Sequence, residues 1–182
     1  MVYTPPPELA GLSLTQIAEA IAERRLPPVE SWEPEAVGES HMQILTDGTW
    51  LHNGSPINRQ AMIRAFGGLL RREADGTYFL VVPYQKLRIE VADACFVATD
   101  VSRVERDLAF RLNTDELVVA GPDHPIRAAG DSDRPALYLG IRRGCEARLN
   151  RSTYEQLAQI AMTEGDDWTV TSGGQTFSLL PA

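Results

Sequence analysis

The spacing of apolar and polar positions changes along the chain from a helical period to strand alternation. Near the N-terminus, Leu14, Ile17 and Ile21 recur at the spacing of one helical face. Ser13 precedes them, and Gln16 follows three residues later, as in a capping box. The two prolines that come after this segment end it, because proline cannot continue a helix. The pattern therefore predicts an N-terminal helix that follows a loose, proline-rich arm.

From Met42 onward the chain is typical of short strands separated by turn residues. Between Lys86 and Val91, apolar residues alternate with charged ones, which indicates a half-exposed strand. The dipeptide Asn53-Gly54 is a strong hairpin signal, because a type I′ turn needs positive φ at both central positions. Gly173-Gly174 marks a second hairpin near the C-terminus.

Two later segments return to helical spacing. The first spans residues 58–72 and has Asn58 as its predicted N-cap. Gly67-Gly68 lies inside it and costs about 1 kcal/mol per residue against alanine, which suggests a kink or the close approach of another backbone. The second helix starts at a capping box formed by Ser152 and Glu155.

The order of these elements is repeated. The triplets Ile57–Arg59 and Leu149–Arg151 each open a helix that two strands follow, and the stretch DGTWLHNGSPI resembles DELVVAGPDHPI. We therefore predict an α+β fold. It has two related strand-rich subdomains, each with one helix packed on a small, mainly antiparallel sheet, plus an N-terminal helix. The predicted boundaries are 1–30 for the arm and helix, 31–100 for the first α+β repeat, and 101–182 for the second repeat with inserted strands.

Four stretches carry a resemblance to a known family: DGTWLHNGSPINR, LLRREADGTYFLVVPYQKLRIEVADACF, FRLNTDELVVAGPDHPIR and TSGGQTFSL. In order and spacing they are similar to an uncharacterised bacterial family, domain of unknown function 1285. The resemblance runs from about Pro28 to the C-terminus. It implies a two-part α+β fold built from related motifs and a suspected regulatory or signalling role. It brings no established catalytic residues.

Composition and charge narrow the classes of partner. The net charge of −8 argues against nucleic acid, whose phosphates need a basic surface, and against anionic membranes. No apolar segment is long enough to cross a bilayer, and the N-terminus lacks the features of a signal peptide. Cys95 and Cys145 are far apart in sequence, which favours buried free thiols in a reducing compartment over a disulfide. We therefore expect a cytoplasmic protein.

The candidate chemistry is sparse. The three histidines lack the spacing of a metal site, and no nucleophile elbow or phosphate-binding glycine loop is present. We therefore predict no catalytic residue, metal or cofactor. Trp50 and His52 share one strand face, either as a cross-strand pair or as a ligand platform. Asp123-His124 lies between prolines and fits an Asx-turn, with an acid–base pair as the alternative.

Two arginines stand out by their position. Arg59 and Arg151 each fall in the first turn of a predicted helix, where the dipole disfavours a cation by about 0.3–1 kcal/mol. Either a salt bridge or a bound anion would compensate for this cost.

We hence predict a regulatory module whose pocket accepts a small anionic ligand or a protein partner's carboxylate. The alternatives are a protein–protein adaptor, or a hydrolase that uses His52 or His124. The predicted ligand-binding residues are Trp50, His52, Arg59, Lys86, Arg88, His124, Arg127 and Arg151.

Overall fold

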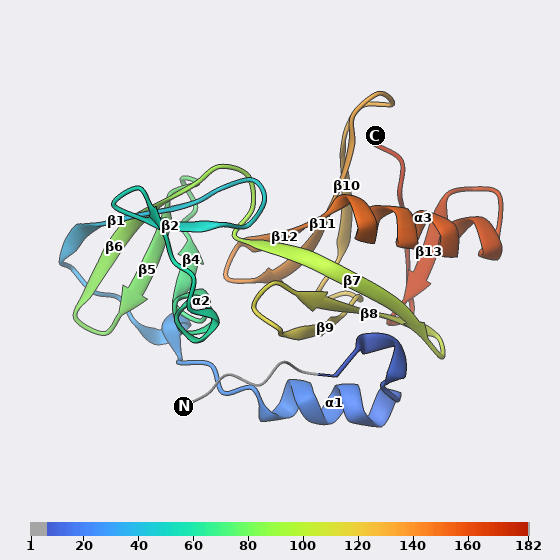
Figure 1. Cartoon of the computed structure of the whole chain (residues 1–182), viewed down its shortest axis with the longest axis horizontal. Coiled ribbons are helices and arrows are strands. Elements are labelled where there is room, and N and C mark those ends of the chain that lie inside the picture. Colours follow the sequence, from blue (N-terminus) through green and yellow to red (C-terminus); the bar gives the residue numbers. More distant parts are fainter. Residues whose placement is uncertain (1–6, 182) are drawn as a thin grey trace.

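The computed structural model describes residues 7–181 and shows two six-stranded mixed sheets side by side (Figure 1). The first six residues of the predicted arm lie outside the described part. The first sheet contains β1 (Val37–Ile44), β2 (Trp50–His52), β3 (Ser55–Pro56), β4 (Leu70–Arg72), β5 (Tyr78–Val82) and β6 (Gln85–Val91). The second contains β7 (Phe96–Val104), β8 (Asp107–Leu112), β9 (Leu117–Val119), β10 (Ile126–Gly130), β11 (Pro135–Arg142) and β12 (Cys145–Leu149).

The helices confirm the predicted α+β class. They are α1 (Leu14–Glu23), α2 (Gln60–Gly67) and α3 (Arg151–Glu164), with short 3-10 turns η1 (Leu9–Gly11) and η2 (Val29–Ser31). The separate hairpin of β13 (Thr169–Ser172) and β14 (Gln175–Ser178) completes the described elements. No helix within residues 7–181 combines the length and the apolar character needed to span a bilayer.

The two sheets share one topology. The first has the strand order β3-β2-β1-β6-β5-β4, and the second, from its β9 edge, has the order β9-β8-β7-β12-β11-β10. In each sheet the first and sixth strands pair in parallel at the centre, as β1 with β6 and β7 with β12. The remaining pairs are antiparallel. The halves are therefore related, as the sequence predicts.

The two helices that follow the Asn-Arg triplets are not equivalent, and this part of the predicted repeat is wrong. Helix α2 connects the third and fourth strands of the first sheet, whereas α3 follows the sixth strand of the second. In the second sheet, a tight turn closed by Gly121 and His124 stands between the third and fourth strands. Each triplet lies where a helix begins. Similar residues can occur at two helix starts because both need the same local capping chemistry, so the triplets do not show that the helices correspond.

Local signals in the sequence are largely confirmed. The Ser13 side chain accepts from the backbone N–H of Gln16, and the Gln16 side chain accepts from the N–H of Ser13. Asn53 and Gly54 have φ of 50° and 80° and join β2 to β3 as a two-residue turn. Gly173-Gly174 does the same for β13 and β14.

The helix predicted over residues 58–72 is too long. Helix α2 ends at Gly67, and the residues from Leu70 to Arg72 form strand β4. A Cβ atom at Gly67 would lie 3.2 Å from Cγ2 of Thr114 and 3.4 Å from Cε1 of Phe96, so side chains of the second half, and not another backbone, approach the glycine. The glycine pair thus ends the helix where it meets the second sheet.

Both predicted caps of the later helices are also wrong. Arg59, not Asn58, is the N-cap of α2, and it makes no side-chain cap. Asn150 caps α3 by accepting from the N–H of Thr153 at 2.8 Å, in place of the Ser152 capping box. In each case the helix starts one or two residues away from the best capping sequence.

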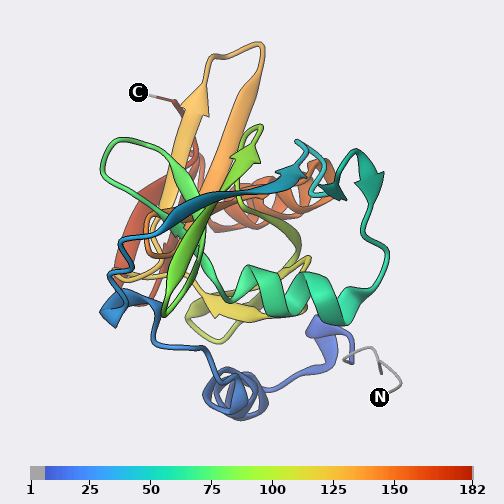
Figure 2. The ribbon, with the colours of Figure 1, turned by 90° about the vertical axis from the view of Figure 1, so that its left-hand side faces the viewer.

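One hydrophobic core extends across both sheets and includes the fully buried rings of Trp50, Phe96 and Phe110. Helix α3 packs on β7 and β12, while α1 packs on β9 from the opposite side of the second sheet (Figures 1 and 2). Helix α1 fully buries one side chain, Ile17, and leaves Ile21 40% exposed. Its apolar face therefore covers the sheet incompletely.

Candidate functional site

A cavity of about 580 Å³ lies between α1, the C-terminal end of α2 and the β8–β9 side of the second sheet. Its volume is within the range of small-molecule sites. Three parts of the fold that are distant in sequence meet there. The polar residues of its wall are four arginines, three acids, one histidine and one glutamine: Arg24, Arg64, Arg111, Arg142, Glu23, Asp115, Glu116, His124 and Gln16. We refer to this space as the α1 cavity.

Glu116 is the buried acid of the α1 cavity, with 8% of its surface exposed. Arg142 donates to both of its carboxylate oxygens, from Nη1 at 2.6 Å and from Nη2 at 3.1 Å. Arg24 adds a third guanidinium contact at 3.3 Å, and the Thr114 hydroxyl donates at 3.0 Å. Two cations thus share one carboxylate.

The protonation of Glu116 follows from these contacts. Burial alone would raise the pKa of its carboxyl group, but the hydrogen bond from Arg142 and the charges of Arg142 and Arg24 outweigh it, so the pKa is lowered. The group is ionised at neutral pH. The single negative charge of Glu116 is therefore in contact with the two positive charges of Arg24 and Arg142.

The pKa of Arg24 also responds to the neighbouring positive charges. Burial lowers its pKa, the Glu116 charge opposes that effect, and the charges of Arg64 and Arg142 lower the pKa further. Its Nη2 atom also donates to the backbone carbonyl of Arg64 at 3.1 Å, which fixes α1 to the end of α2. Positive groups are thus crowded where the helices meet.

Arg64 and Arg111 extend the basic wall. Within residues 7–181, the half-buried Arg64 side chain forms no hydrogen bond or ion pair. The Arg111 guanidinium donates to the backbone carbonyls of Pro7 at 2.6 Å and Asp115 at 3.4 Å, and burial lowers its pKa. Arg64 therefore keeps its donors available to a ligand.

His124 is the one predicted ligand-binding residue that lines the α1 cavity, as far as residues 7–181 show. Its Nδ1 atom lies 3.0 Å from the carbonyl oxygen of Gly140, to which it donates when that nitrogen carries the proton. The backbone groups of Gly121 and His124 pair across the Gly-Pro-Asp-His turn. The ring is therefore held at the wall by a defined turn.

Trp50 and His52 lie away from the cavity. Trp50 is 1% exposed, and its ring stacks on Phe66 with the ring centroids 6.1 Å apart. Its indole N–H is buried and finds no hydrogen-bond acceptor in the described part of the chain. His52 is exposed on β2 of the first sheet, whereas His124 lies beside the second. Trp50 therefore contributes to the core.

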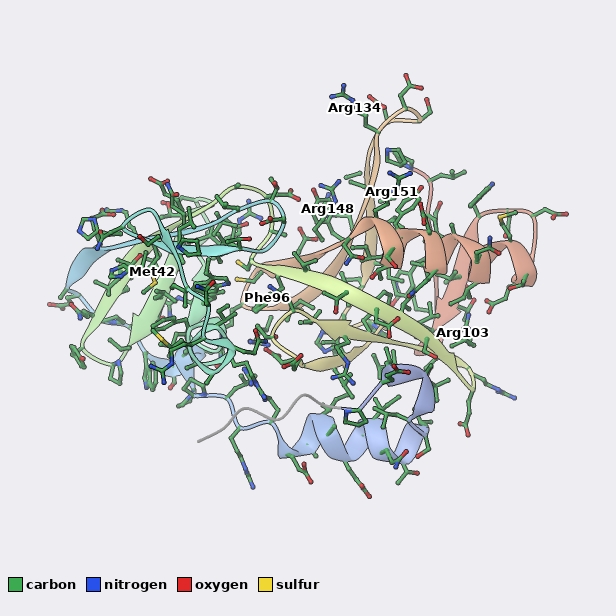
Figure 3. The ribbon with its side chains drawn as sticks, in the orientation of Figure 1. Met42, Phe96, Arg103, Arg134, Arg148 and Arg151 are labelled. Atoms are coloured by element: carbon green, nitrogen blue, oxygen red, sulfur yellow. The ribbon has the colours of Figure 1, made fainter. Side chains whose placement is uncertain are left out.

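The arginines that open the helices also lie outside the cavity. Arg151 is 93% exposed and pairs with Glu155 at 3.1 Å, one helical turn later. Figure 3 places Arg151 on the side of the second sheet away from α1. Arg59 is exposed at the start of α2, and the described residues give its side chain no ion-pair partner.

The remaining predicted cations are paired with acids on the surface. Lys86 donates to Glu73 at 2.9 Å and lies over the Phe79 ring, and Arg88 binds Glu39 at 2.9 Å. Arg127 binds Glu146 through two hydrogen bonds and lies over the ring of Tyr138. The structure thus distributes the predicted residues over both halves.

Sequence reasoning missed the arginines that line the α1 cavity. They come from the C-cap of α1, from α2, from β8 and from β11, and no local motif connects these segments. One signal was present, because Arg111 interrupts the apolar strand Leu108–Leu112. Within residues 7–181, no group of three or more histidine, cysteine or acidic side chains is arranged to hold a metal ion.

The fold and site define a class: an α+β protein with two sheets of the same topology and an arginine-rich cavity beside an N-terminal helix. The chain belongs to the DUF1285 family. Residues 27–94 match "Domain of unknown function (DUF1285), N-terminal domain", and residues 95–179 match "Protein of unknown function (DUF1285), C-terminal domain". No protein of the curated set matches it significantly.

Two solved structures are similar to this chain. A DUF1285 family protein from Silicibacter pomeroyi DSS-3 is 37% identical, with a TM-score of 0.77, over 93% of this chain and 96% of that one. A DUF1285 family protein from Shewanella baltica OS155 is 23% identical, with a TM-score of 0.54, over 69% of this chain and 92% of that one. The second similarity concerns the fold alone.

Proposed function

We propose that this protein is a non-catalytic ligand-binding module that senses a small oxyanion in the α1 cavity. The observation that carries the proposal is the Arg64 guanidinium, which lines the cavity without a hydrogen bond or ion pair in residues 7–181, next to a Glu116 carboxylate that two other arginines already share. Arginine binds carboxylate and phosphate through paired, charge-assisted hydrogen bonds. An anion would relieve the crowding of positive charge.

The location of the cavity supports a regulatory role. Its wall combines the N-terminal helix, the helix of the first half and the sheet of the second half. A ligand that contacts all three would favour the arrangement in which they are packed together. Binding in the cavity would therefore change how firmly α1 is held, which a partner protein could detect.

Calorimetric titration of the wild type and of Arg64→Ala tests the proposal. The probes are inorganic phosphate, acetate, citrate and a nucleoside monophosphate, with acetamide as the uncharged match of acetate. We expect at least one anion to bind the wild type and to lose tenfold or more in affinity in Arg64→Ala. Because the Arg64 side chain forms no hydrogen bond or ion pair in the described residues, the variant should fold as the wild type does.

Arg59→Ala is the matched control, because Arg59 lies at the other end of the same helix, exposed and outside the cavity wall. It should bind every probe as the wild type does. At one hundred times its Kd, a ligand should raise the free energy of unfolding by about 2.7 kcal/mol. Equal binding by Arg64→Ala and the wild type, or no binding of any anion, would contradict the proposal.

A further inference from the structure

The α1 cavity has an apolar side as well as a basic one. Leu12, Ile21 and Leu26 line it from the N-terminal segment, and Leu117, Val118 and Ile141 line it from the second sheet. A site for a fully hydrated anion such as phosphate would need the basic side alone. The aliphatic wall points to a ligand that also has an apolar part.

Two of these side chains are among the large hydrophobic residues that the structure leaves exposed. Ile21 is 40% exposed and Leu26 is 38% exposed, on either side of Arg24 in sequence. Ile21 lies in the last turn of α1, and the backbone N–H of the C-cap residue Arg24 donates to its carbonyl, so the two residues are close together where the helix ends. The apolar and basic sides of the cavity therefore adjoin at this point.

Leu26 extends the apolar surface toward the end of α2. A Cβ atom at Gly68 would lie 3.6 Å from Cδ2 of Leu26, so the leucine approaches the backbone just beyond the helix. The carbonyl of Arg64, which accepts from Arg24, belongs to the last turn of the same helix. An apolar group beside Leu26 would thus have the Arg64 guanidinium within the same cavity.

We propose that the ligand is an amphiphilic oxyanion: a carboxylate or phosphate monoester carried on an aliphatic or aromatic body. The oxyanion would bind Arg64 beside Arg24 and Arg142, and the apolar body would cover Ile21 and Leu26 beneath α1. This inference rests on the proposed function, and it adds the chemical class of the ligand. The acidic protein as a whole favours a free molecule over an anionic lipid surface.

Titration with straight-chain carboxylates from acetate to decanoate, and with alkyl phosphates of the same lengths, tests the inference. Each added methylene should raise the affinity about three- to fourfold until the cavity is filled. The corresponding alcohols should bind more weakly than the anions, because they cannot engage the arginines. Arg64→Ala should weaken every anion and leave the alcohols unchanged.

Ile21→Ser separates the apolar side from the basic one. Serine and isoleucine have similar helix propensities, and Ile21 is partly exposed, so α1 should stay folded. The variant should reduce the gain per methylene while acetate binds as before. Leu180→Ser is the matched control, since Leu180 is 53% exposed and does not line the cavity.

The outcomes distinguish this inference from the proposed function. Equal affinity for acetate and octanoate, with both weakened in Arg64→Ala, would overturn the amphiphile and leave the anion site standing. Failure of every carboxylate and phosphate to bind would overturn both. Binding of anionic vesicles that depends on Arg64, without binding of the free alkyl anions, would overturn the free molecule as the ligand.

Discussion

Arg142 of β11 holds Glu116 by both carboxylate oxygens, at 2.6 and 3.1 Å, in a wall where Arg24 approaches the same acid from α1. The Arg142–Glu116 pair lies within the second half and is mostly withdrawn from water, and the contact of Arg24 with Glu116 connects it to the end of the N-terminal helix. Removing one partner of such a pair leaves the other buried and uncompensated, which is the costly case for an ion pair.

Glu116→Gln should therefore lower the free energy of unfolding by about 3 kcal/mol, because two guanidiniums lose their shared acid. Chemical denaturation followed by circular dichroism measures the change. Glu155→Gln is the control, since the exposed pair of Glu155 with Arg151 contributes about 0.5 kcal/mol or less. If both variants lost the same free energy of unfolding, the buried Glu116 cluster would contribute no more to stability than an exposed ion pair.

The same acid should give the protein a distinct dependence on pH. Its pKa in the folded state is lowered from the ordinary value of 4.5, so its stabilising contribution is complete above that value and is lost as the pH falls below it. Denaturation of the wild type and Glu116→Gln at several pH values between 7 and 3 tests this. The difference between the two should shrink below about pH 4.5, and a constant difference would contradict it.

Trp50 should act on stability and not on ligand binding. Its ring is 1% exposed and stacked on Phe66, so Trp50→Ala opens a cavity in the core and should cost about 3–5 kcal/mol. Tyr84→Ala, at a side chain 74% exposed, should change stability by less than about 0.5 kcal/mol. If the folded Trp50→Ala protein bound anions less tightly than the wild type, Trp50 would belong to the site after all.

The two cysteines should be unreactive in the folded protein. Cys95 and Cys145 are almost completely buried, and their thiols contact each other. The hydrogen bond with Cys145 and burial raise the pKa of Cys95, whereas the same hydrogen bond and nearby arginines lower the pKa of Cys145. The protection of Cys145 therefore comes from its burial, which keeps reagents away from the sulfur. Native protein should react with a disulfide reagent only as fast as it opens, whereas denatured protein should release two equivalents at once. Rapid native reaction of either thiol would contradict this.

The sequence predicted those features that a few neighbouring residues determine. The Asn53-Gly54 turn needs positive φ at two adjacent positions, and the Ser13 capping box needs two polar side chains three residues apart. The end of α2 was missed because Leu70–Arg72 has good helix formers, and their pairing with β5 decides their structure.

The cavity could not be predicted in the same way. Arg24, Arg64 and Arg142 become neighbours through the packing of α1, α2 and the second sheet. The residues adjacent to each arginine in sequence give no indication that the other two lie nearby. Arg59 attracted attention because its helix position is visible locally. The same helix carries the arginine that lines the cavity at its other end.

The parallel pairing at the centre of each sheet has a consequence for how such units can be joined. Because the first and sixth strands run in the same direction, a chain enters one of these units at one end of the sheet and leaves at the opposite end. Four residues between Val91 and Phe96 then suffice to start the next unit. Copies of this fold can accordingly follow one another head to tail without a long return segment.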